Sequence, residues 1–296
     1  MHKFVSVIIP AYESMGDLPD CLEALMKQSY PKDCYEIIVV DNGQNYGIES
    51  LVKKYPNVFL VAEVRPGSYV ARNTGLCHAR GEFVVFTDAD CIAHTDFLSS
   101  GISVLESDEN CGLVGGQIVL RELIPQQPTA VELFEREFTF TQEKYIKKGK
   151  QASTANVFTS AEVIKKVGNF DQNLKSTGDF EWSHRISKAG YELFYSPEAC
   201  VYHPTRRTWK AIAKRTKRIA GGKHDKLMNT GFTVKKFLVG LRCAAFPLGR
   251  ARQIIGSEKL SLANKIKIFS VMIFVSIIET RERVLLQFFH RVSTRS

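Results

Sequence analysis

Four short, mostly apolar runs in the first hundred residues constrain the fold of this chain more than any other feature. They cover Val5 to Ile9, Glu36 to Val40, Val58 to Glu63 and Phe83 to Phe86. Between them lie helical patterns, one around Leu18 to Met26 and one from about Tyr69 to Ala79. Apolar strands that alternate with helices are typical of a parallel sheet buried on both faces. The sequence therefore predicts an α/β fold with a doubly wound, mostly parallel sheet and helices on both faces.

Polar residues follow each of these four predicted strands. Ligands of open α/β sheets bind at the carboxyl ends of the strands, so these residues are the first candidates for a binding site. They are Pro10, Tyr12 and Glu13 after the first strand, Asp41 after the second, Arg65 after the third, and Asp88, Ala89 and Asp90 after the fourth. The sequence thus predicts a site at one edge of the sheet.

Asp88 and Asp90 are separated by one small residue directly after the fourth strand. Strand alternation would direct both carboxylates to the same side, where they repel each other unless a cation joins them. Mg²⁺ or Mn²⁺, completed by substrate phosphates, would relieve that repulsion. The alternative is that both aspartates cap a helix that begins near Ala93. The convergence of polar strand ends favours the metal, and His203, at the end of a later strand, is a third candidate ligand.

Two interpretations are open for each of four further residues. Asp41 could accept hydrogen bonds from a base or ribose, or could serve a turn before a glycine. Arg72 could contact a phosphate, or could be a surface arginine on a helix. Asp179 and Glu181 precede an apparent helix, where a carboxylate either interacts with the helix dipole or acts as a general base.

The net charge of +9 is distributed unevenly along the chain. Residues 1–203 carry 19 Lys and Arg against 27 Asp and Glu, a net charge of −8, whereas residues 204–296 carry 21 against 4, a net charge of +17. We therefore expect one large domain over residues 1–203 and a basic, helical section over residues 204–296. In that section a helix is expected over Thr208 to Ala220, ended by Gly221 and Gly222. Further apolar segments are Phe232 to Leu248 and Ile268 to Ile278.

Basic amphipathic helices with aromatic residues favour in-plane attachment to an anionic cytoplasmic membrane surface. The alternative is that they pack on the first domain or on a second subunit. No apolar run reaches the length of a spanning helix, and the N-terminal run is too short for a secretory signal. The seven cysteines are scattered singly, as in reduced cytosolic proteins. These features predict a cytoplasmic protein that is peripheral at the membrane.

In their order along the chain, these motifs resemble glycosyltransferase family 2, the inverting enzymes of the GT-A fold. The resemblance covers about Ser6 to His203. The motifs that carry the resemblance are Val5-Ser6-Val7-Ile8-Ile9-Pro10-Ala11-Tyr12, Ala71-Arg72-Asn73-Thr74-Gly75, Thr87-Asp88-Ala89-Asp90 and Gly178-Asp179-Phe180-Glu181. The last of these is similar to the acidic E-D-x-E motif of the family, although Gly178 stands where many members have glutamate.

The resemblance implies a role for each candidate residue. Donor-nucleotide binding would involve Pro10, Tyr12, Glu13, Asp41 at the nucleobase, Arg72 at the diphosphate, and Asp88, Ala89 and Asp90. Metal binding would involve Asp90, Asp88 and His203. The catalytic base would be Asp179, with Glu181 as the other candidate because of Gly178. Asn156 and Trp182 would lie on the acceptor side.

The function that the resemblance implies is transfer of a sugar from a nucleotide-diphosphate sugar to a hydroxyl of a glycan or lipid-linked acceptor. The donor would be a UDP-sugar, because UDP is the commonest donor nucleotide in the family. Mg²⁺ or Mn²⁺ would assist the transfer. One alternative is a nucleotidyltransferase of related α/β fold. The other is a protein that binds nucleotide sugars or nucleic acid without transferase activity, although no nucleic-acid motif is found, so no nucleic-acid partner is expected.

Overall fold

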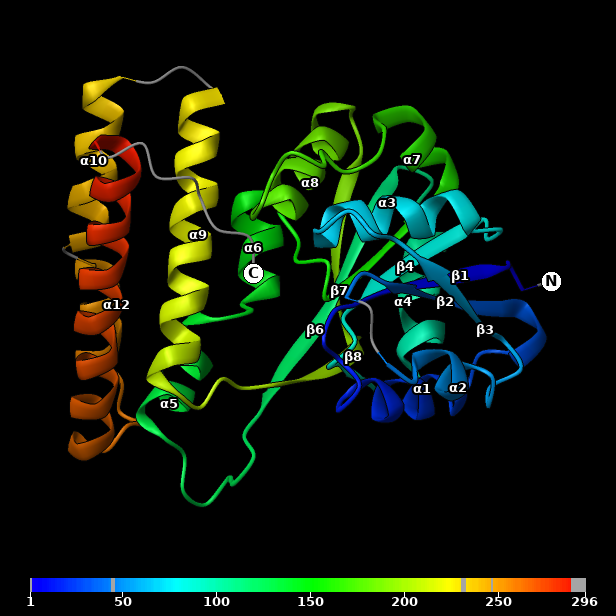
Figure 1. The fold of residues 1–296 in the computed structure, drawn as a ribbon, viewed down its shortest axis with the longest axis horizontal. Coiled ribbons are helices and arrows are strands. Elements are labelled where there is room, and N and C mark those ends of the chain that lie inside the picture. The colour runs from blue at the N-terminus through cyan, green and yellow to red at the C-terminus, as the bar shows by residue number, and fades with distance from the viewer. Residues whose placement is uncertain (1, 44–45, 230–232, 246, 289–296) are drawn as a thin grey trace. The chain divides into compact units, whose positions relative to one another are not determined.

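The computed structural model describes residues 2–43, 46–229, 233–245 and 247–288, and its helices and strands are shown in Figure 1. The chain divides into two compact units. The first comprises residues 1–119, 140–172 and 178–203, and the second comprises residues 120–139, 173–177 and 204–296. Phe232 and Phe246, which the sequence places in an apolar segment of the basic section, lie outside the described residues.

Within the described residues, eight strands form one sheet with the order β3-β2-β1-β4-β7-β6-β8-β5. The strands are β1 (Val5–Ala11), β2 (Tyr35–Asp41), β3 (Val58–Ala62), β4 (Phe83–Thr87), β5 (Ile92–Ala93), β6 (Cys111–Arg121), β7 (Asn156–Ser160) and β8 (Glu192–Pro204). β3, β2, β1 and β4 are parallel neighbours, whereas β7 is antiparallel to β4 and β5 is antiparallel to β8. All four strands predicted from the apolar runs are therefore confirmed, and they form the parallel part of the sheet.

Burial on both faces explains why these strands are apolar without interruption. Val5, Val7 and Ile9 of β1 belong to one core cluster with the apolar side chains of α1 (Leu18–Met26), α2 (Ile48–Val52) and α4 (Phe97–Glu106). On the opposite face Ile8 lies against α3 (Ser68–His78). A Cβ atom on Gly75 would lie 2.5 Å from Cγ2 of Ile8, so α3 packs closely on the sheet only because residue 75 is glycine.

The remaining helices of the first unit surround the antiparallel strands. They are α6 (Gln142–Gly149), α7 (Ala161–Val167) and α8 (Gly178–Lys188). The alternative in which Asp88 and Asp90 cap a helix near Ala93 is wrong, because residues 92 and 93 form β5 and the next helix begins at Phe97. The later strand that carries His203 is β8, which runs without a break from Glu192 to Pro204.

The second unit is helical and contains α5 (Ala130–Phe138), α9 (Trp209–Asn229), α10 (Val234–Ala245), α11 (Leu248–Ile255) and α12 (Leu262–Phe288). Its core includes Ile212 of α9, Phe134 of α5 and Val271 of α12. Two glutamates of α5, Glu132 and Glu135, are buried in this unit and pair with arginines that follow β8 or lie on α9. Among the described helices, none combines the length and the apolar character that crossing a bilayer requires.

One sequence prediction in this unit is wrong. Gly221 and Gly222 do not end a helix, because α9 continues through both to Asn229. A Cβ atom on Gly222 would lie 2.6 Å from Cβ of Ser176, so this glycine allows a close contact between two segments of the unit. Gly222 therefore reflects packing, and neither glycine ends the helix.

Candidate active site at the carboxyl edge of the sheet

The register of the sheet brings the predicted strand ends together. Ala11 at the end of β1 is paired with Asp41 at the end of β2, and Asp41 is paired in turn with Ala62 at the end of β3. Asn156, the first residue of the antiparallel strand β7, is paired with Thr87 at the end of β4. The loops that carry the candidate residues therefore start from adjacent points on one edge of the sheet.

Arg72 is not a surface arginine. Its side chain is only 4% exposed, and its Nη2 donates to Oδ1 of Asp88 over 2.5 Å. The Nε atom of Arg72 is buried and has no hydrogen-bond partner among the described residues. The first turns of α3 thus hold a guanidinium against the carboxylate that follows β4, at the edge where a substrate phosphate would bring negative charge.

Asp88 and Asp90 have different partners, although the alternation argument placed both carboxylates on the same side. Residues 89 and 90 lie in a turn, closed by the Cys91 backbone N–H, which donates to the carbonyl of Asp88. Asp88 pairs with Arg72, whereas Asp90 faces His203. A turn reorients successive side chains, so the period of two that holds within a strand ends at Thr87.

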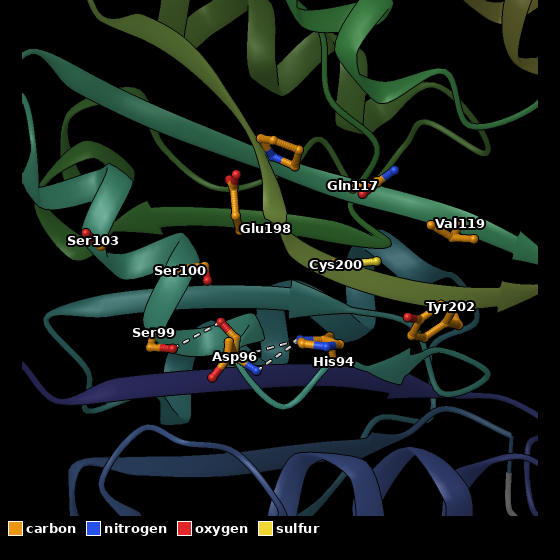
Figure 2. A pocket seen from close by; sticks show the side chains of 11 residues that line it. His94, Asp96, Ser99, Ser100, Ser103, Gln117, Val119, Glu198, Cys200 and Tyr202 are labelled. Atoms are coloured by element: carbon orange, nitrogen blue, oxygen red, sulfur yellow. Dashed lines mark hydrogen bonds and ion pairs between the residues drawn. The ribbon is translucent and has the colours of Figure 1, made fainter.

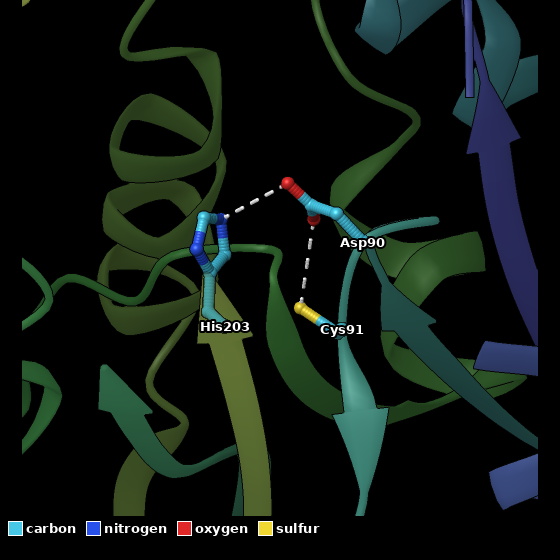
Figure 3. Close-up of side chains that lie close together, drawn as sticks. All are labelled: Asp90, Cys91 and His203. Carbon is cyan, nitrogen blue, oxygen red and sulfur yellow. Dashed lines mark hydrogen bonds and ion pairs between the residues drawn. The ribbon is translucent and has the colours of Figure 1, made fainter. Parts of the chain in front are cut away.

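Figure 3 shows Asp90, Cys91 and His203, whose potential ligand atoms all lie within 4.8 Å of one another. Nε2 of His203 lies 3.6 Å from Oδ2 of Asp90. Burial raises the pKa of the Cys91 thiol, which keeps it protonated, and hard divalent ions prefer oxygen and imidazole nitrogen to a thiol. The donor set of Asp90 and His203 fits Mn²⁺ or Mg²⁺ with most coordination positions left for water and phosphate oxygens. The ring of Phe140 packs on His203 at 4.6 Å and so restricts the orientation of the imidazole.

Asp179 lies in the first turn of α8 and is held by a tyrosine of α3. The hydroxyl of Tyr69 donates to Oδ1 of Asp179 over 3.2 Å and accepts the backbone N–H of Gly178 over 2.8 Å. The Tyr69 ring is buried and stacks on Phe170. Burial and the nearby Asp179 charge raise the pKa of Tyr69, so the hydroxyl stays a donor. Tyr69 and Arg72 are one helical turn apart, so a single helix contacts both Asp179 and Asp88.

Steric contact explains glycine at position 178, where the resemblance noted in the sequence would place glutamate. A Cβ atom at this position would lie 2.7 Å from Cε2 and 2.8 Å from Cζ of the Tyr69 ring. Such distances are shorter than a carbon–carbon contact allows. Glycine at position 178 therefore accompanies the tyrosine that bonds the neighbouring carboxylate.

Glu181 is bonded to its own helix. Its Oε1 accepts from Nε of Arg185 over 2.9 Å, while Oε2 is buried without a hydrogen-bond partner among the described residues. Arg185 also donates to backbone carbonyls at the end of α7, including that of Asn169 over 2.6 Å. Glu181 therefore orients Arg185, which links the segment after α7 to α8.

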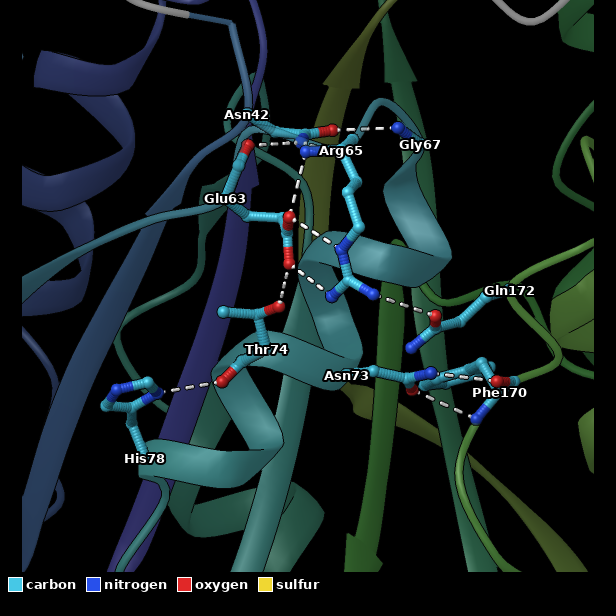
Figure 4. Close-up of polar contacts among 9 residues, drawn as sticks. All are labelled: Asn42, Glu63, Arg65, Gly67, Asn73, Thr74, His78, Phe170 and Gln172. Carbon is cyan, nitrogen blue, oxygen red and sulfur yellow. Dashed lines mark hydrogen bonds and ion pairs between the residues drawn. The ribbon is translucent and has the colours of Figure 1, made fainter.

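Figure 4 shows how the loops beside Asp41 are fixed. The Asn42 side chain donates to the carbonyls of Glu63 and Arg65 over 2.8 and 2.7 Å, and it accepts the backbone N–H of Gly67 over 3.0 Å. Arg65 binds the buried Glu63 carboxylate, and this contact, with a hydrogen bond from Thr74, lowers the Glu63 pKa to about 2. Arg65 is thus a loop-bracing residue.

The loop after β1 lies beside these braced loops. Gly43 is so close to Tyr12 that a Cβ atom would lie 3.0 Å from Cδ2 of the tyrosine. Half of the Tyr12 surface is exposed, and Glu13 next to it has a left-handed backbone with φ of 49°. The Gly43 backbone N–H donates to Oδ1 of Asp41 over 3.1 Å, the turn contact expected of an aspartate before glycine. The exposed ring of Tyr12 is thereby held near Asp41.

The two predicted acceptor-side residues are completely buried. Asn156 donates its amide to the carbonyls of Gln117 and Ala199, which ties β7 to neighbouring strands. Trp182 donates Nε1 to the carbonyl of Gly168 over 2.9 Å and packs on Phe86. Both residues support the interior of the first unit. Neither side chain is accessible to a ligand, because both are completely buried.

A separate polar cavity of about 680 Å³ lies over α4, β6 and β8 of the first unit (Figure 2). Its lining includes Ser100, Gln117, Glu198 and Tyr202. None of the predicted site residues lines it, and Tyr202 and His203, consecutive on β8, point to opposite faces of that strand. We therefore assign the candidate active site by its charged side chains at the strand ends and not by the size of a cavity.

Three residues of this site were not predicted. Tyr69 and Phe140 contact Asp179 and His203 from helices or loops distant in sequence, and Asn42 braces the loops beside Asp41. An asparagine before a glycine at a strand end is a signal for a loop-bracing side chain. For the two aromatic residues the sequence carries no signal, because their role depends on a tertiary contact.

The sequence and the fold of this chain are similar to those of known proteins. The family model described as "Glycosyl transferase family 2" matches residues 6–166. The chain is 34% identical over 217 residues to glycosyltransferase AglE of Haloferax volcanii, covering 72% of this chain and 70% of that protein. It is 25% identical to a dolichyl N-acetyl-alpha-D-glucosaminyl phosphate 3-beta-D-2,3-diacetamido-2,3-dideoxy-beta-D-glucuronosyltransferase of Methanococcus voltae, covering 72% and 71%.

Among solved structures, the fold is similar to that of the mannosyltransferase PcManGT from Pyrobaculum calidifontis, determined in complex with GDP-Man and Mn²⁺. The TM-score is 0.68 at 20% identity, with 97% of this chain and 88% of that chain covered. At this identity the likeness is one of fold. It confirms the predicted GT-A architecture.

Proposed function

Since the chain belongs to glycosyl transferase family 2, and is therefore a glycosyltransferase that uses a nucleotide-sugar donor, we propose that it transfers the sugar to a hydroxyl acceptor by an inverting single displacement. The observation that carries this proposal is the pairing of Asp90 with His203, 3.6 Å apart, at the sheet edge where Arg72 meets Asp88. A divalent cation, Mn²⁺ or Mg²⁺, held by Asp90 and His203 with Asp88 nearby, would neutralise charge on the leaving nucleoside diphosphate.

The residues of the chain have distinct tasks in this mechanism. Asp179 removes the proton of the acceptor hydroxyl, whose oxygen attacks C1 of the sugar as the bond from C1 to the diphosphate oxygen breaks on the opposite face. Tyr69 orients Asp179 through the 3.2 Å hydrogen bond, and the first turn of α8 favours the charged carboxylate. Glu181 is the weaker candidate for the base because it is bonded to Arg185.

On the donor side, Asp41, Tyr12 and the loop with Pro10 and Glu13 would receive the nucleoside. Arg72 would contact the diphosphate, and Asp88 with the adjacent Ala89 would approach the ribose. The hydrogen bonds of Asn42 support this arrangement, since they brace the loop after β2 before any nucleotide arrives. We propose that Asn156 and Trp182 act on the acceptor side only by supporting the strands and helix beneath it, because both are buried.

The identities of the donor and the acceptor are also proposed. UDP-sugars are the first donors to test and GDP-mannose the second, the latter because PcManGT was solved with it. A lipid-linked acceptor is favoured over a free glycan because the Methanococcus voltae relative is named for a dolichyl-linked phosphate sugar.

The catalytic proposal is tested with the purified full chain and a panel of nucleotide sugars, with and without Mn²⁺. Release of free nucleoside diphosphate is expected, and release of pyrophosphate would show nucleotidyl transfer. Asp90→Ala and Asp179→Asn should each abolish transfer with melting temperatures unchanged, while Asp96→Asn, at an exposed aspartate of the same unit, should retain it. Turnover by either variant would remove that residue from the mechanism, and retention of the anomeric configuration would refute single displacement.

We also propose that the second unit attaches the enzyme to the anionic, cytoplasmic surface of a membrane. Its helices expose large apolar side chains next to many lysines and arginines: Val234, Leu238 and Val239 of α10, Leu248 and Ile255 of α11, and Leu262, Ile266, Ile273, Ile277 and Phe288 of α12. Burial of such a face in the interface, with about 1 kcal/mol for each well-placed basic residue, would suffice for peripheral binding.

Flotation with vesicles tests this attachment. The protein should float with vesicles that contain phosphatidylglycerol at low salt, and less with phosphatidylcholine alone. Replacement of Leu238 and Val239 by serine should reduce flotation severalfold, whereas Val64→Ser, at an even more exposed apolar residue of the first unit, should not. A protein that stays unbound at low and moderate salt would contradict the proposal.

A further inference from the structure

An apolar cavity of about 440 Å³ lies within the second unit, between the junction of α10 with α11 and the C-terminal half of α12. Its walls are Ala245 and Pro247 on one side and Met272, Ile273 and Ile277 of α12 on the other. Cavities of 300 to 1,000 Å³ are about the size that small ligands occupy. Apolar walls that open to solvent favour an apolar ligand, because binding removes their surface from water.

The cavity continues an exposed apolar stripe of the same helix. Leu262, Ile266, Ile273 and Ile277 are spaced by four, seven and four residues, which places them on one face of α12, and each is more than half exposed. The last two of them line the cavity. The opposite face of α12, with Val271 and Val275, is buried in the core of the unit. The exposed face of α12 therefore carries apolar side chains as far as the cavity, interrupted by Ser270, which does not line the cavity.

The cavity also has a polar end. Ser276, Thr280 and Arg281 belong to its lining, and Thr280 follows Ser276 by one helical turn. The Oγ1 atom of Thr280 is buried and has no hydrogen-bond partner among the residues that the structure describes. Arg281 is exposed, and no ion pair is found for it within the described part of the chain. Both residues line the cavity, and a guanidinium at its edge is suited to a ligand with an anionic oxygen.

Size decides between the candidate occupants. A helix of a partner protein is about 10 Å or more across, so 440 Å³ would hold little more than one turn of it. A methylene group takes up roughly the volume of a water molecule, about 30 Å³, so the same volume accommodates a hydrocarbon chain on the order of twelve carbons. We propose that this cavity binds a single hydrocarbon chain of a membrane lipid whose phosphate contacts Arg281 and Thr280.

The binding of dodecyl phosphate to the full chain tests this site by titration calorimetry below the micelle concentration of the probe. One molecule should bind per chain, and inorganic phosphate alone should not bind at the same concentrations. Ser276→Trp places an indole in the cavity and should weaken binding by about tenfold or more. Ser270→Trp, on the exposed surface of the same helix and outside the cavity, should leave binding unchanged.

The phosphate contact is tested separately. Arg281→Gln should weaken the binding of dodecyl phosphate by about tenfold and leave the binding of dodecanol unchanged, because only the charged contact is lost. Equal affinities of the two serine variants, or equal binding of inorganic phosphate, would overturn the proposal. So would a concentration-dependent dimer that Ser276→Trp abolishes, since the occupant would then be a second copy of the chain. Donor hydrolysis should be unchanged in Ser276→Trp, Ser270→Trp and Arg281→Gln. A failure of the lipid-binding proposal can therefore be told apart from a failure of the catalytic proposal.

Discussion

Replacement of Tyr69 by phenylalanine isolates the hydrogen bond that orients the proposed base. The ring can keep its stacking on Phe170, so the change removes only the hydroxyl, which donates to Asp179 over 3.2 Å and accepts the Gly178 N–H over 2.8 Å. A hydrogen bond to a charged group contributes about 1.5 to 3 kcal/mol, and the length of this one and the partial exposure of Asp179 favour the lower value. One pKa unit corresponds to 1.36 kcal/mol, so loss of the hydrogen bond should shift the pKa of Asp179 by about one unit.

The direction of the shift follows from which form of Asp179 the hydroxyl stabilises. Tyr69 donates to the charged carboxylate, so its loss favours the protonated, inactive form. The acid limb of the profile of kcat/KM against pH should move to higher pH by about one unit in Tyr69→Phe. The unpaired Gly178 N–H should also cost about 1 kcal/mol of stability, or about 3 °C in Tm.

The matched control is Tyr145→Phe. Tyr145 packs on Phe180, the neighbour of Asp179, but its hydroxyl makes no hydrogen bond found among the described residues. That variant should leave the acid limb in place. If Tyr69→Phe lowered the Tm while the limb stayed where it is in the parent enzyme, Tyr69 would be a structural residue only, and the reasoning on the base would be refuted.

Two further predictions concern stability. Arg65→Gln should lower the urea midpoint at pH 7, because the folded protein loses the ion pair with Glu63. The difference in midpoint should shrink as pH falls from about 4.3 to 2, because the pKa of Glu63 is held at about 2 only in the folded protein. Gly178→Ala should destabilise the protein by about 1 to 3 kcal/mol in thermal unfolding, because the added Cβ would meet the Tyr69 ring. If Gly178→Ala destabilised a Tyr69→Ala variant by the same amount, contact with the Tyr69 ring would not be the cause.

The parallel sheet and its edge were predictable because their signals are local. Uninterrupted apolar runs follow from burial of a strand on both faces, and the carboxyl ends of parallel strands meet by topology. Asp41, Asp88 and Asp90 were therefore located correctly at one edge from the strand ends alone. Which carboxylate faces which partner was not predictable, because a turn after Thr87 sends the two side chains of the D-x-D motif to Arg72 and His203 separately.

Other features escaped prediction because they depend on tertiary contacts. Gly221 and Gly222 satisfy the local rule for a helix end, yet α9 continues, since Gly222 is needed where the helix meets Ser176. Asn156 has the polarity of a ligand-binding residue, but its amide joins three strands inside the sheet. Local patterns describe what a residue could do, and packing selects which of those tasks it performs.

The contact between Gly178 and Tyr69 has a consequence for the history of the family. The two positions are 109 residues apart in the chain, yet a side chain at one excludes the ring at the other. We expect relatives with glutamate at the position of Gly178 to carry a smaller or differently placed residue where this chain has Tyr69. Substitutions at the two sites should therefore be found together when related sequences are aligned, so that neither column varies independently of the other.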